Sequence, residues 1–248
     1  MKINVSFGRI IFLVLLATLL LMTVTACKDS ETGGNNSGSG NGGGTAQKDD
    51  TKTNLTPNPE SDFEYEVDGD RVIITGYIGE SDVVVIPDKI ESKAVTEIGQ
   101  GAFYNHAKLY DKNDLTIVVI PDSVITIRQA AFSSCSLKSV TIGKGVTTIE
   151  MSAFKSSKLQ TVTIPGNVTE IGMSVFAECG LLKSVVIENG VTSIGNKAFD
   201  RCFALVDVTL PDSVVEIHQL AFDNSRVLSE ESKAKIKEIN PDALFGAR

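Results

Sequence analysis

The hydrophobic residues of this chain recur with a spacing of 22 or 23 residues from about residue 83 to about residue 225. The copy that begins at Leu137 reads LKSVTIGKGVTTIEMSAFKSSK. Its regularly spaced apolar residues are Leu137, Val140, Ile142, Val146, Ile149, Ala153 and Phe154. The first three alternate as in a half-buried strand, the next two indicate an extended or turning segment, and the last two lie in a stretch with the potential for one or two helical turns. Each copy therefore turns the chain around once.

Six of the 11 phenylalanines occupy the same position in consecutive copies. They are Phe103, Phe132, Phe154, Phe176, Phe199 and Phe222, and their spacing is 29 residues once and then 22, 22, 23 and 23. One copy offers about seven inward side chains worth about 1.5–3 kcal/mol each, against about 1–2 kcal/mol of backbone entropy for each of its residues. A single copy cannot fold alone, so the six copies from 83 to 228 are expected to stack and to bury their columns against each other.

The common pattern of these copies, L-x-x-V-x-I-P-x-x-V-x-x-I-G-x-x-A-F-x-x-C, resembles the bacterial surface leucine-rich repeat of the BspA type. The resemblance implies an α/β fold of a particular kind, a right-handed leucine-rich-repeat solenoid with short parallel strands and short helical turns. It also implies a secreted or surface protein. One column departs from the pattern, because the Gly position holds Gly99, Arg128, Glu150, Gly172, Gly195 and His218. That position is therefore not expected to require a left-handed backbone.

Both ends of the repeat region have the sequence features of caps. In residues 63–82, Phe63, Tyr65 and Val67 alternate, and Asp68-Gly69 is a two-residue hairpin signal before a returning strand at Val72–Thr75. Residues 229–248 begin with a predicted N-cap, Ser229, and Pro241 is expected to end the helix. We therefore expect an N-terminal hairpin cap and a C-terminal helix cap. Extra residues of the first copy, around 91–94 and 105–114, are expected to form loops.

The first 26 residues have the layout of a secretory signal. Lys2 and Arg9 precede an uncharged run from Ile10 to Met22. A retained membrane anchor is the alternative, since Ile10 to Ala26 is at the lower limit of a spanning length. The sequence Val24-Thr25-Ala26-Cys27 resembles the bacterial lipoprotein box, which implies that Cys27 is acylated and becomes the N-terminus. It also implies a lipid-anchored protein of the cell envelope, in the outer membrane or at the cell surface.

Residues 27–62 are expected to hold the acylated Cys27 and a flexible tether. The segment from 28 to 62 is rich in Gly, Ser and Asn, and Leu55 is its one large apolar residue. A coil of this length spans about 30–35 Å.

The charge of the chain excludes an electrostatic nucleic-acid binder. The formal net charge is −8 and becomes −10 when residues 1–26, with Lys2 and Arg9, are removed. Only two histidines, His106 and His218, are present, and no pair of acid and base residues or nucleophile stands out. We expect no catalytic residues and no cofactor.

One column of the repeat contains residues that could bind a metal or form a disulfide. It holds His106, Cys135, Ser157, Cys179, Cys202 and Ser225. Stacked repeats advance about 4.8 Å each, whereas zinc needs its ligand atoms within about 2.0–2.3 Å of one point, so a zinc site is not expected. Buried thiols and a Cys179–Cys202 disulfide both stay open. Asp111–Asp114 begins like a calcium loop but lacks its later ligands, and His218 is expected at the surface.

The outward positions of the predicted strands form a hydroxyl-rich, nearly uncharged strip. Following Ile117 and Val119, its residues are Ser139, Thr141, Thr161, Thr163, Ser184, Val186, Asp207 and Thr209. Thr and Val are favoured on any pleated surface, which is the alternative explanation. As a binding platform, the strip would serve a non-catalytic protein that binds surface or matrix proteins of a host or a neighbouring cell. A glycan-binding or structural envelope component is the alternative function, and we expect a monomer.

Overall fold

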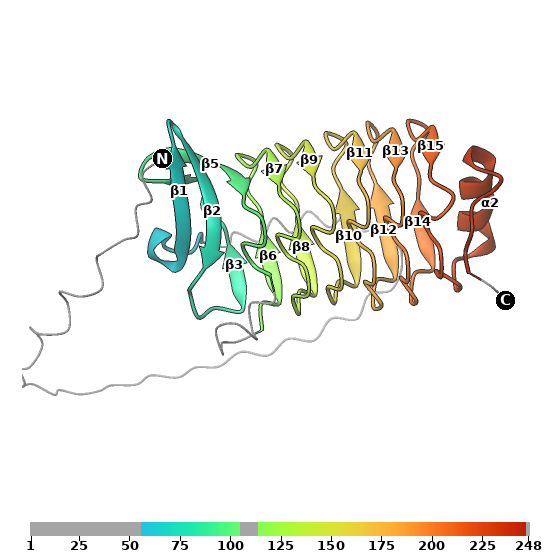
Figure 1. The fold of residues 1–248 in the computed structure, drawn as a ribbon, viewed down its shortest axis with the longest axis horizontal. Coiled ribbons are helices and arrows are strands. Elements are labelled where there is room, and N and C mark those ends of the chain that lie inside the picture. Colours follow the sequence, from blue (N-terminus) through green and yellow to red (C-terminus); the bar gives the residue numbers. More distant parts are fainter. Residues whose placement is uncertain (1–55, 105–113, 247–248) are drawn as a thin grey trace, which may run out of the picture. The chain divides into compact units, whose positions relative to one another are not determined.

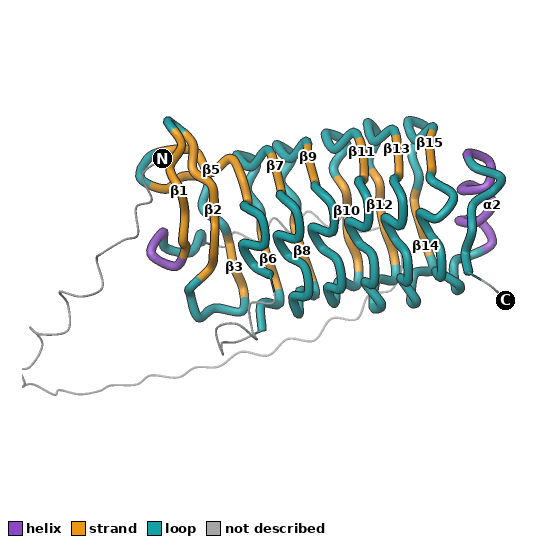
Figure 2. The backbone as a smooth tube through the Cα atoms, viewed as in Figure 1, coloured by secondary structure: helices purple, strands orange, loops and turns teal. Residues whose placement is uncertain are grey.

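The computed structural model describes residues 56–104 and 114–246, which form a parallel β-solenoid of about six turns (Figure 1). Each turn contributes two short strands and a series of tight turns (Figure 2). The first strand side consists of β3 (Val83–Val85), β6 (Ile117–Val119), β8 (Ser139–Thr141), β10 (Thr161–Ile164), β12 (Ser184–Ile187) and β14 (Asp207–Thr209). The second consists of β5 (Lys93–Ile98), β7 (Thr126–Ile127), β9 (Thr148–Ile149), β11 (Glu170–Ile171), β13 (Ser193–Ile194) and β15 (Glu216–Ile217). The predicted fold class is confirmed.

The register of the strands follows the sequence repeat. Val162 on β10 pairs with Val185 on β12, which pairs with Val208 on β14. Equivalent residues of successive copies therefore lie side by side, and their inward side chains form continuous buried columns.

The aromatic rings form one continuous stack through the core. From Phe103 to Phe222, neighbouring ring centroids are 4.8–5.4 Å apart and the rings are within 17° of parallel. Tyr77 extends the stack by one ring, 5.9 Å from Phe103. The expected alignment of the six phenylalanines is therefore confirmed.

The stretch around Ala153 and Phe154 forms hydrogen-bonded turns instead of the helical turn that its sequence suggests. Ser152 and Ser156 have φ of 60° and 57°, the left-handed region that a type II turn needs at its third position. Alternate amides bond within the turn and across to the next copy: Ala153 N–H donates to Glu150 O, and Phe154 N–H donates to Val175 O. A helix would use both amides internally, so stacking of the copies replaces it.

The Gly column behaves as its sequence suggests. Gly99, Gly172 and Gly195 do not have positive φ, and Arg128, Glu150 and His218 are accommodated there without a left-handed backbone. In the four copies from Arg128 to Gly195, the left-handed residues lie two and six positions after this column.

The N-terminal cap is a hairpin of β1 (Phe63–Asp68) and β2 (Arg71–Tyr77), preceded by the short 3-10 helix η2 (Glu60–Asp62). Its two-residue turn is Gly69-Asp70, one position later than predicted, because Asp68 pairs with Arg71. β2 pairs in parallel with β5, so the hairpin continues the solenoid. The first group of extra residues forms a small hairpin between β4 (Lys89–Ile90) and β5. The second group, except for Asp114, lies outside the described residues.

The C-terminal cap is α2 (Glu230–Ile239). Ser229 is its N-cap and accepts a hydrogen bond from the backbone N–H of Ser232. The hydroxyl of Ser232 accepts from Val208 N–H, and Asn240 Nδ2 donates to Ile217 O at 2.6 Å. The helix and its C-cap thus satisfy backbone hydrogen-bonding groups of β14 and β15, the last strands of the two sides. Ile236 of the helix is buried. The core extends from Phe63 to Ala243, so the solenoid and its caps form a self-contained unit.

Both strand sides are interrupted between the copies that begin at Leu137 and Leu159. Within residues 114–246, β8 does not pair with β10 and β9 does not pair with β11, whereas every other neighbouring pair of strands on these sides is in register. The turns and the phenylalanine stack continue across the break, with Phe154 and Phe176 5.3 Å apart. A cavity of about 430 Å³ lies at the break, lined by residues 147–151 and by Gln129, Thr169, Glu170 and Gly172. We call this feature the ladder break.

Candidate binding surface

The predicted strip lies on the outer face of β8, β10, β12 and β14. One row contains Ser139, Thr161, Ser184 and Asp207, and the other contains Thr141, Thr163, Val186 and Thr209. Seven of the eight side chains are exposed and Ser184 is half-buried. Asp207 is the single charged residue among them. The strip is thus the neutral, hydroxyl-rich surface that the alternating pattern suggests.

The ladder break divides the strip into two unequal parts. The six residues on β10, β12 and β14 stand on one hydrogen-bonded sheet, with Thr161 beside Ser184 and Ser184 beside Asp207. Ser139 and Thr141 belong to the sheet of β3, β6 and β8, next to the half-buried Ile117 and Val119. The structure therefore places three quarters of the strip on a single continuous ladder.

The hydroxyls of the strip are available to a partner. None of the eight side chains makes a side-chain hydrogen bond or an ion pair with another residue that the structure describes. On the opposite strand side, in contrast, Thr192 Oγ1 donates to Thr169 O at 2.9 Å. The strip offers free donors and acceptors held at fixed spacing by the backbone ladder.

A group of exposed apolar residues beside the strip was not predicted from the sequence. It consists of Leu181, Phe203, Val206 and Val227, which are 52, 57, 40 and 51% exposed, and we call it the corner patch. These residues lie at the turns that lead into β12, into β14 and toward α2. The signal in the sequence is the change of spacing from 22 to 23, because the extra residue of the longer copies is inserted at this corner.

The cysteine column is a structural feature of the core. Cys135, Cys179 and Cys202 are free, buried thiols, so the Cys179–Cys202 disulfide is not formed in this structure. The thiols of Cys179 and Cys202 donate to Phe154 O and Phe176 O of the preceding copies at 3.3 and 3.2 Å. Ser225 does the same with its hydroxyl, to Phe199 O at 2.9 Å. Burial raises the pKa of Cys179 to about 11 and that of Cys202 well above its ordinary value, which makes both poor nucleophiles.

The remaining candidates for chemistry do not form a site in the described residues. His218 is exposed, and its Nδ1 accepts a hydrogen bond from Leu220 N–H at 3.1 Å. Within residues 56–104 and 114–246, no group of three or more His, Cys, Asp or Glu side chains could hold a metal ion. Cys27, His106 and residues 111–113 of the calcium-like segment lie outside these ranges.

A small charge network crosses the turn side of the solenoid. Glu178 accepts a hydrogen bond from Ser156 Oγ at 2.8 Å and lies 3.4 Å from Lys155 Nζ and 3.8 Å from an Arg201 nitrogen. The hydrogen bond from Ser156, together with the two cations, holds the pKa of Glu178 below its ordinary value of 4.5. This network links three successive copies.

The helices of the described part of the chain include none that is long and apolar enough to span a bilayer.

Comparisons with known proteins identify the repeat. The family model of the BspA type leucine-rich repeat region matches six copies over residues 96–229, more than half of the chain. A T. pallidum leucine-rich repeat protein of known structure is 27% identical with a TM-score of 0.60, and the match covers 78% of this chain and 100% of that one. A leucine-rich cell surface protein from Faecalibacterium prausnitzii is 30% identical with a TM-score of 0.55, over 71% of this chain and 54% of that one.

A third structure shares the fold alone. The pneumococcal vaccine antigen PcpA is 22% identical with a TM-score of 0.51, over 70% of this chain and 48% of that one. No curated protein matches the chain. The repeat, its register and the matched family model together show that the chain belongs to the BspA-type leucine-rich repeat family.

Proposed function

We propose that the protein is a non-catalytic, lipid-anchored protein of the bacterial cell surface whose solenoid binds proteins of a host or of neighbouring cells. The observation that carries the proposal is the strip, in which mostly exposed, nearly uncharged side chains stand in register on β10, β12 and β14 and the hydroxyls make no side-chain hydrogen bond with another residue of the described ranges. Similarity to a leucine-rich cell surface protein supports the location.

The geometry of the strip favours an extended protein surface as the ligand. Neighbouring strands of a sheet are about 4.8 Å apart, so the strip presents a rigid row of contacts whose ordering requires little further loss of conformational entropy. Its near neutrality removes the desolvation cost that a charged platform would impose on an uncharged partner. Hydroxyls and a few aliphatic groups can then bond to the backbone and side chains of the partner.

Replacing Thr141, Thr163 and Thr209 with lysine tests the strip. All three point to solvent, so the melting temperature is expected to change little, while three new cations on the face should weaken partner binding at least about tenfold. The assay is capture of partner from host extracellular matrix and from the envelope of the organism, followed by titration of the isolated partner. Unchanged affinity would exclude this face.

A matched control uses the opposite strand side. Thr147, Thr148 and Thr169 are also exposed threonines, in β9 or directly before β9 and β11, and their replacement with lysine adds the same charge. This variant should keep its affinity. If it loses as much as the strip variant, the effect comes from net charge and the strip is not the binding surface.

The lipid anchor is tested separately at Cys27. We expect the chain with Cys27 to take up labelled fatty acid and to partition into the detergent phase. The Cys27→Ser variant should do neither, because the acylated thiol is absent. Incorporation of label into that variant would refute the anchor, and retention of residues 1–26 would point instead to a membrane-spanning signal segment.

Glycan binding is the second candidate, and the hydroxyl-rich composition of the strip favours it. A glycan array probed with residues 56–248 separates the two functions. A protein-binding strip leaves the array without signal, whereas signal that the strip variant loses would assign the strip to a glycan.

A further inference from the structure

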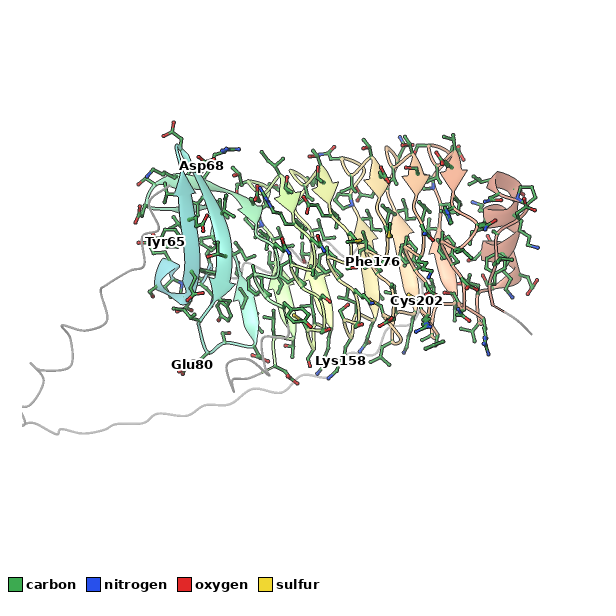
Figure 3. The ribbon with its side chains drawn as sticks, viewed as in Figure 1. Tyr65, Asp68, Glu80, Lys158, Phe176 and Cys202 are labelled. Carbon is green, nitrogen blue, oxygen red and sulfur yellow. The ribbon has the colours of Figure 1, made fainter. Side chains whose placement is uncertain are left out.

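The corner that carries the corner patch also carries several cations, although the chain as a whole is acidic. Four cations lie at the same corner of the solenoid as Leu181, Phe203, Val206 and Val227. Lys183 and Arg226 lie on the turns of this patch, and Lys138 and Lys158 lie on the equivalent turns of the two preceding copies. We call these eight residues together the corner ridge. Figure 3 shows Lys158 at the edge of the solenoid, pointing away from the body.

The cations of the ridge are not neutralised by neighbouring acids. None of the four forms an ion pair with a described residue, and Lys158 Nζ donates to the neutral hydroxyl of Ser136 at 3.0 Å. Asp207, at the start of β14, adjoins the ridge, and Glu230 and Glu231 follow Val227 closely at the start of α2. Glu178, before the turn of Leu181, is already paired with Lys155 and Arg201.

Among the residues that the structure describes, the basic character belongs to the later copies. The same corner in the first two turns of the solenoid carries Asp82 and Asp114, with Thr116 Oγ1 donating to Asp82 at 3.1 Å. In the described part of the chain, the corner therefore changes from acidic to basic and apolar along the rod. Since the whole chain has a formal charge of −8, the ridge concentrates positive charge against the overall balance.

The apolar side chains of the ridge are held at the tips of rigid turns. Leu182 N–H donates to Cys179 O and Leu205 N–H donates to Cys202 O, both at 3.0 Å, so each corner is a closed four-residue turn. Leu181 and Phe203 occupy the central positions of these turns. A residue at such a tip projects outward, which explains why these large side chains remain more than half exposed in a well-packed repeat.

A convex row of apolar tips between lysines has the chemistry of a membrane-binding edge. Apolar side chains can enter the boundary between headgroups and acyl chains, while lysine stems extend their charges to the phosphates. A flat, fluid surface can contact successive tips at once, whereas a folded protein would need a groove of matching shape. Each cation near an anionic leaflet adds attraction that salt weakens.

We propose that the corner ridge binds the surface of an anionic phospholipid bilayer. Leu181, Phe203 and Val227 enter the interface. Lys158, Lys183 and Arg226 lie against the phosphate groups. The ridge adjoins the strip but lies on the corner turns, whereas the strip lies on the strand faces, so the solenoid can lie on a membrane by its ridge while the strip faces a partner.

Sedimentation with lipid vesicles tests the proposal on residues 56–248, which contain the complete core and both caps and lack the anchor. The fragment should bind vesicles of phosphatidylcholine with phosphatidylglycerol, bind phosphatidylcholine alone much less, and lose binding at high salt. A variant with serine in place of Leu181, Phe203 and Val227 should have a partition coefficient at least about tenfold lower. A variant with glutamine in place of Lys158 and Lys183 should lower the partition coefficient about tenfold or more. Equal binding to both kinds of vesicle, or none, overturns the proposal.

Matched controls come from other sides of the solenoid. Ile125, Met173 and Val215 are exposed apolar residues away from the ridge, and Lys144 and Lys197 are exposed lysines away from it. Replacing the first set with serine or the second with glutamine should leave vesicle binding unchanged. If these variants lose binding as strongly as the ridge variants, binding depends on overall composition and the ridge is excluded.

Fluorescence of an introduced tryptophan measures insertion at one position of the surface, independently of the sedimentation of the serine and glutamine variants. The chain has no tryptophan, so Phe203→Trp places a single indole on the ridge and Val215→Trp places one on the opposite strand side. Vesicles with brominated acyl chains should quench the indole of the Phe203→Trp variant strongly and that of the Val215→Trp variant little. Equal quenching of the two variants, or no quenching of the ridge indole, refutes insertion by the ridge. The strip variant adds three cations beside the ridge, so it should bind anionic vesicles at least as well as the unchanged fragment while it loses partner binding. Failure of the ridge and failure of the proposed function are therefore distinguishable.

Discussion

Replacing Phe176 with alanine is expected to lower the free energy of unfolding by about 4 kcal/mol. Phe176 is fully buried in the middle of the stack, and its ring lies 5.3 Å from that of Phe154 and 5.4 Å from that of Phe199. Removal of the ring leaves a cavity between two neighbours that are fixed by their own copies and cannot move together.

The magnitude follows from two contributions. Truncation of a buried phenylalanine to alanine costs about 3–5 kcal/mol in transfer and cavity terms. Each lost ring pair is worth about 0.5–1.5 kcal/mol beyond area burial, part of which the truncation value already includes. A total near the middle of this range is a large fraction of the about 5–15 kcal/mol that stabilises a typical domain.

Urea unfolding of residues 56–248, followed by circular dichroism, measures the effect. With an m-value of about 2 kcal/mol/M, the midpoint should fall by about 2 M. The control is Phe203→Ala, which removes the same ring from a site that is 57% exposed and should cost less than about 1 kcal/mol. A loss below about 1 kcal/mol at Phe176, or equal losses at both sites, would refute the stacked core as the main source of stability.

Three further predictions concern other parts of the solenoid. In native hydrogen exchange, the amide of Gly172 should exchange faster than that of Gly195, because Gly195 N–H donates to Ile171 O at 2.8 Å and the equivalent bond is absent among the described residues at the ladder break; equal protection would contradict the break. Because the folded pKa of Glu178 lies below 4.5, its contribution is present above that pH and is lost as the pH falls through the folded value. Glu178→Gln should therefore flatten the decline of the free energy of unfolding below about pH 4.5, by less than about 1 kcal/mol since the side chain is 38% exposed. An unchanged profile of stability against pH would argue against the network. Cys179, with a pKa of about 11, has roughly one thousandth of its thiol ionised at pH 8. Alkylation without reductant should label Cys179 and Cys202 only after unfolding, whereas no label after unfolding would indicate a disulfide.

The repeat itself could be predicted from the sequence because it depends on local periodicity. The spacing of Phe132, Phe154 and Phe176 fixes which residues become neighbours once the copies stack, and the stack follows. The caps were also predictable, since Ser229 and Pro241 act within a few residues of the helix they delimit. Of the surface, the strip was predictable because strand alternation decides which side chains point outward.

The turn conformations could not be predicted, because they depend on hydrogen bonds between copies. Ala153 and Phe154 have helical potential in isolation, and only the carbonyl of Val175 in the next copy draws the Phe154 amide away from a helix. The hairpin turn shifted by one residue for a similar reason. Pairing of β2 with β5 fixes the position of β2, and the turn at Gly69 then follows from the register with β1.

The sequence by itself determined the number of copies, the buried columns and the sides to which their residues point, because each of these depends on spacing along the chain. Only the tertiary structure decided where the strand ladder breaks and which exposed residues gather on one ridge. The copies on either side of the break are alike in sequence, and Leu181, Phe203 and Val227 become neighbours only when turns from three copies are stacked. Contacts between copies, which no single copy encodes, therefore distinguish one part of this regular rod from another.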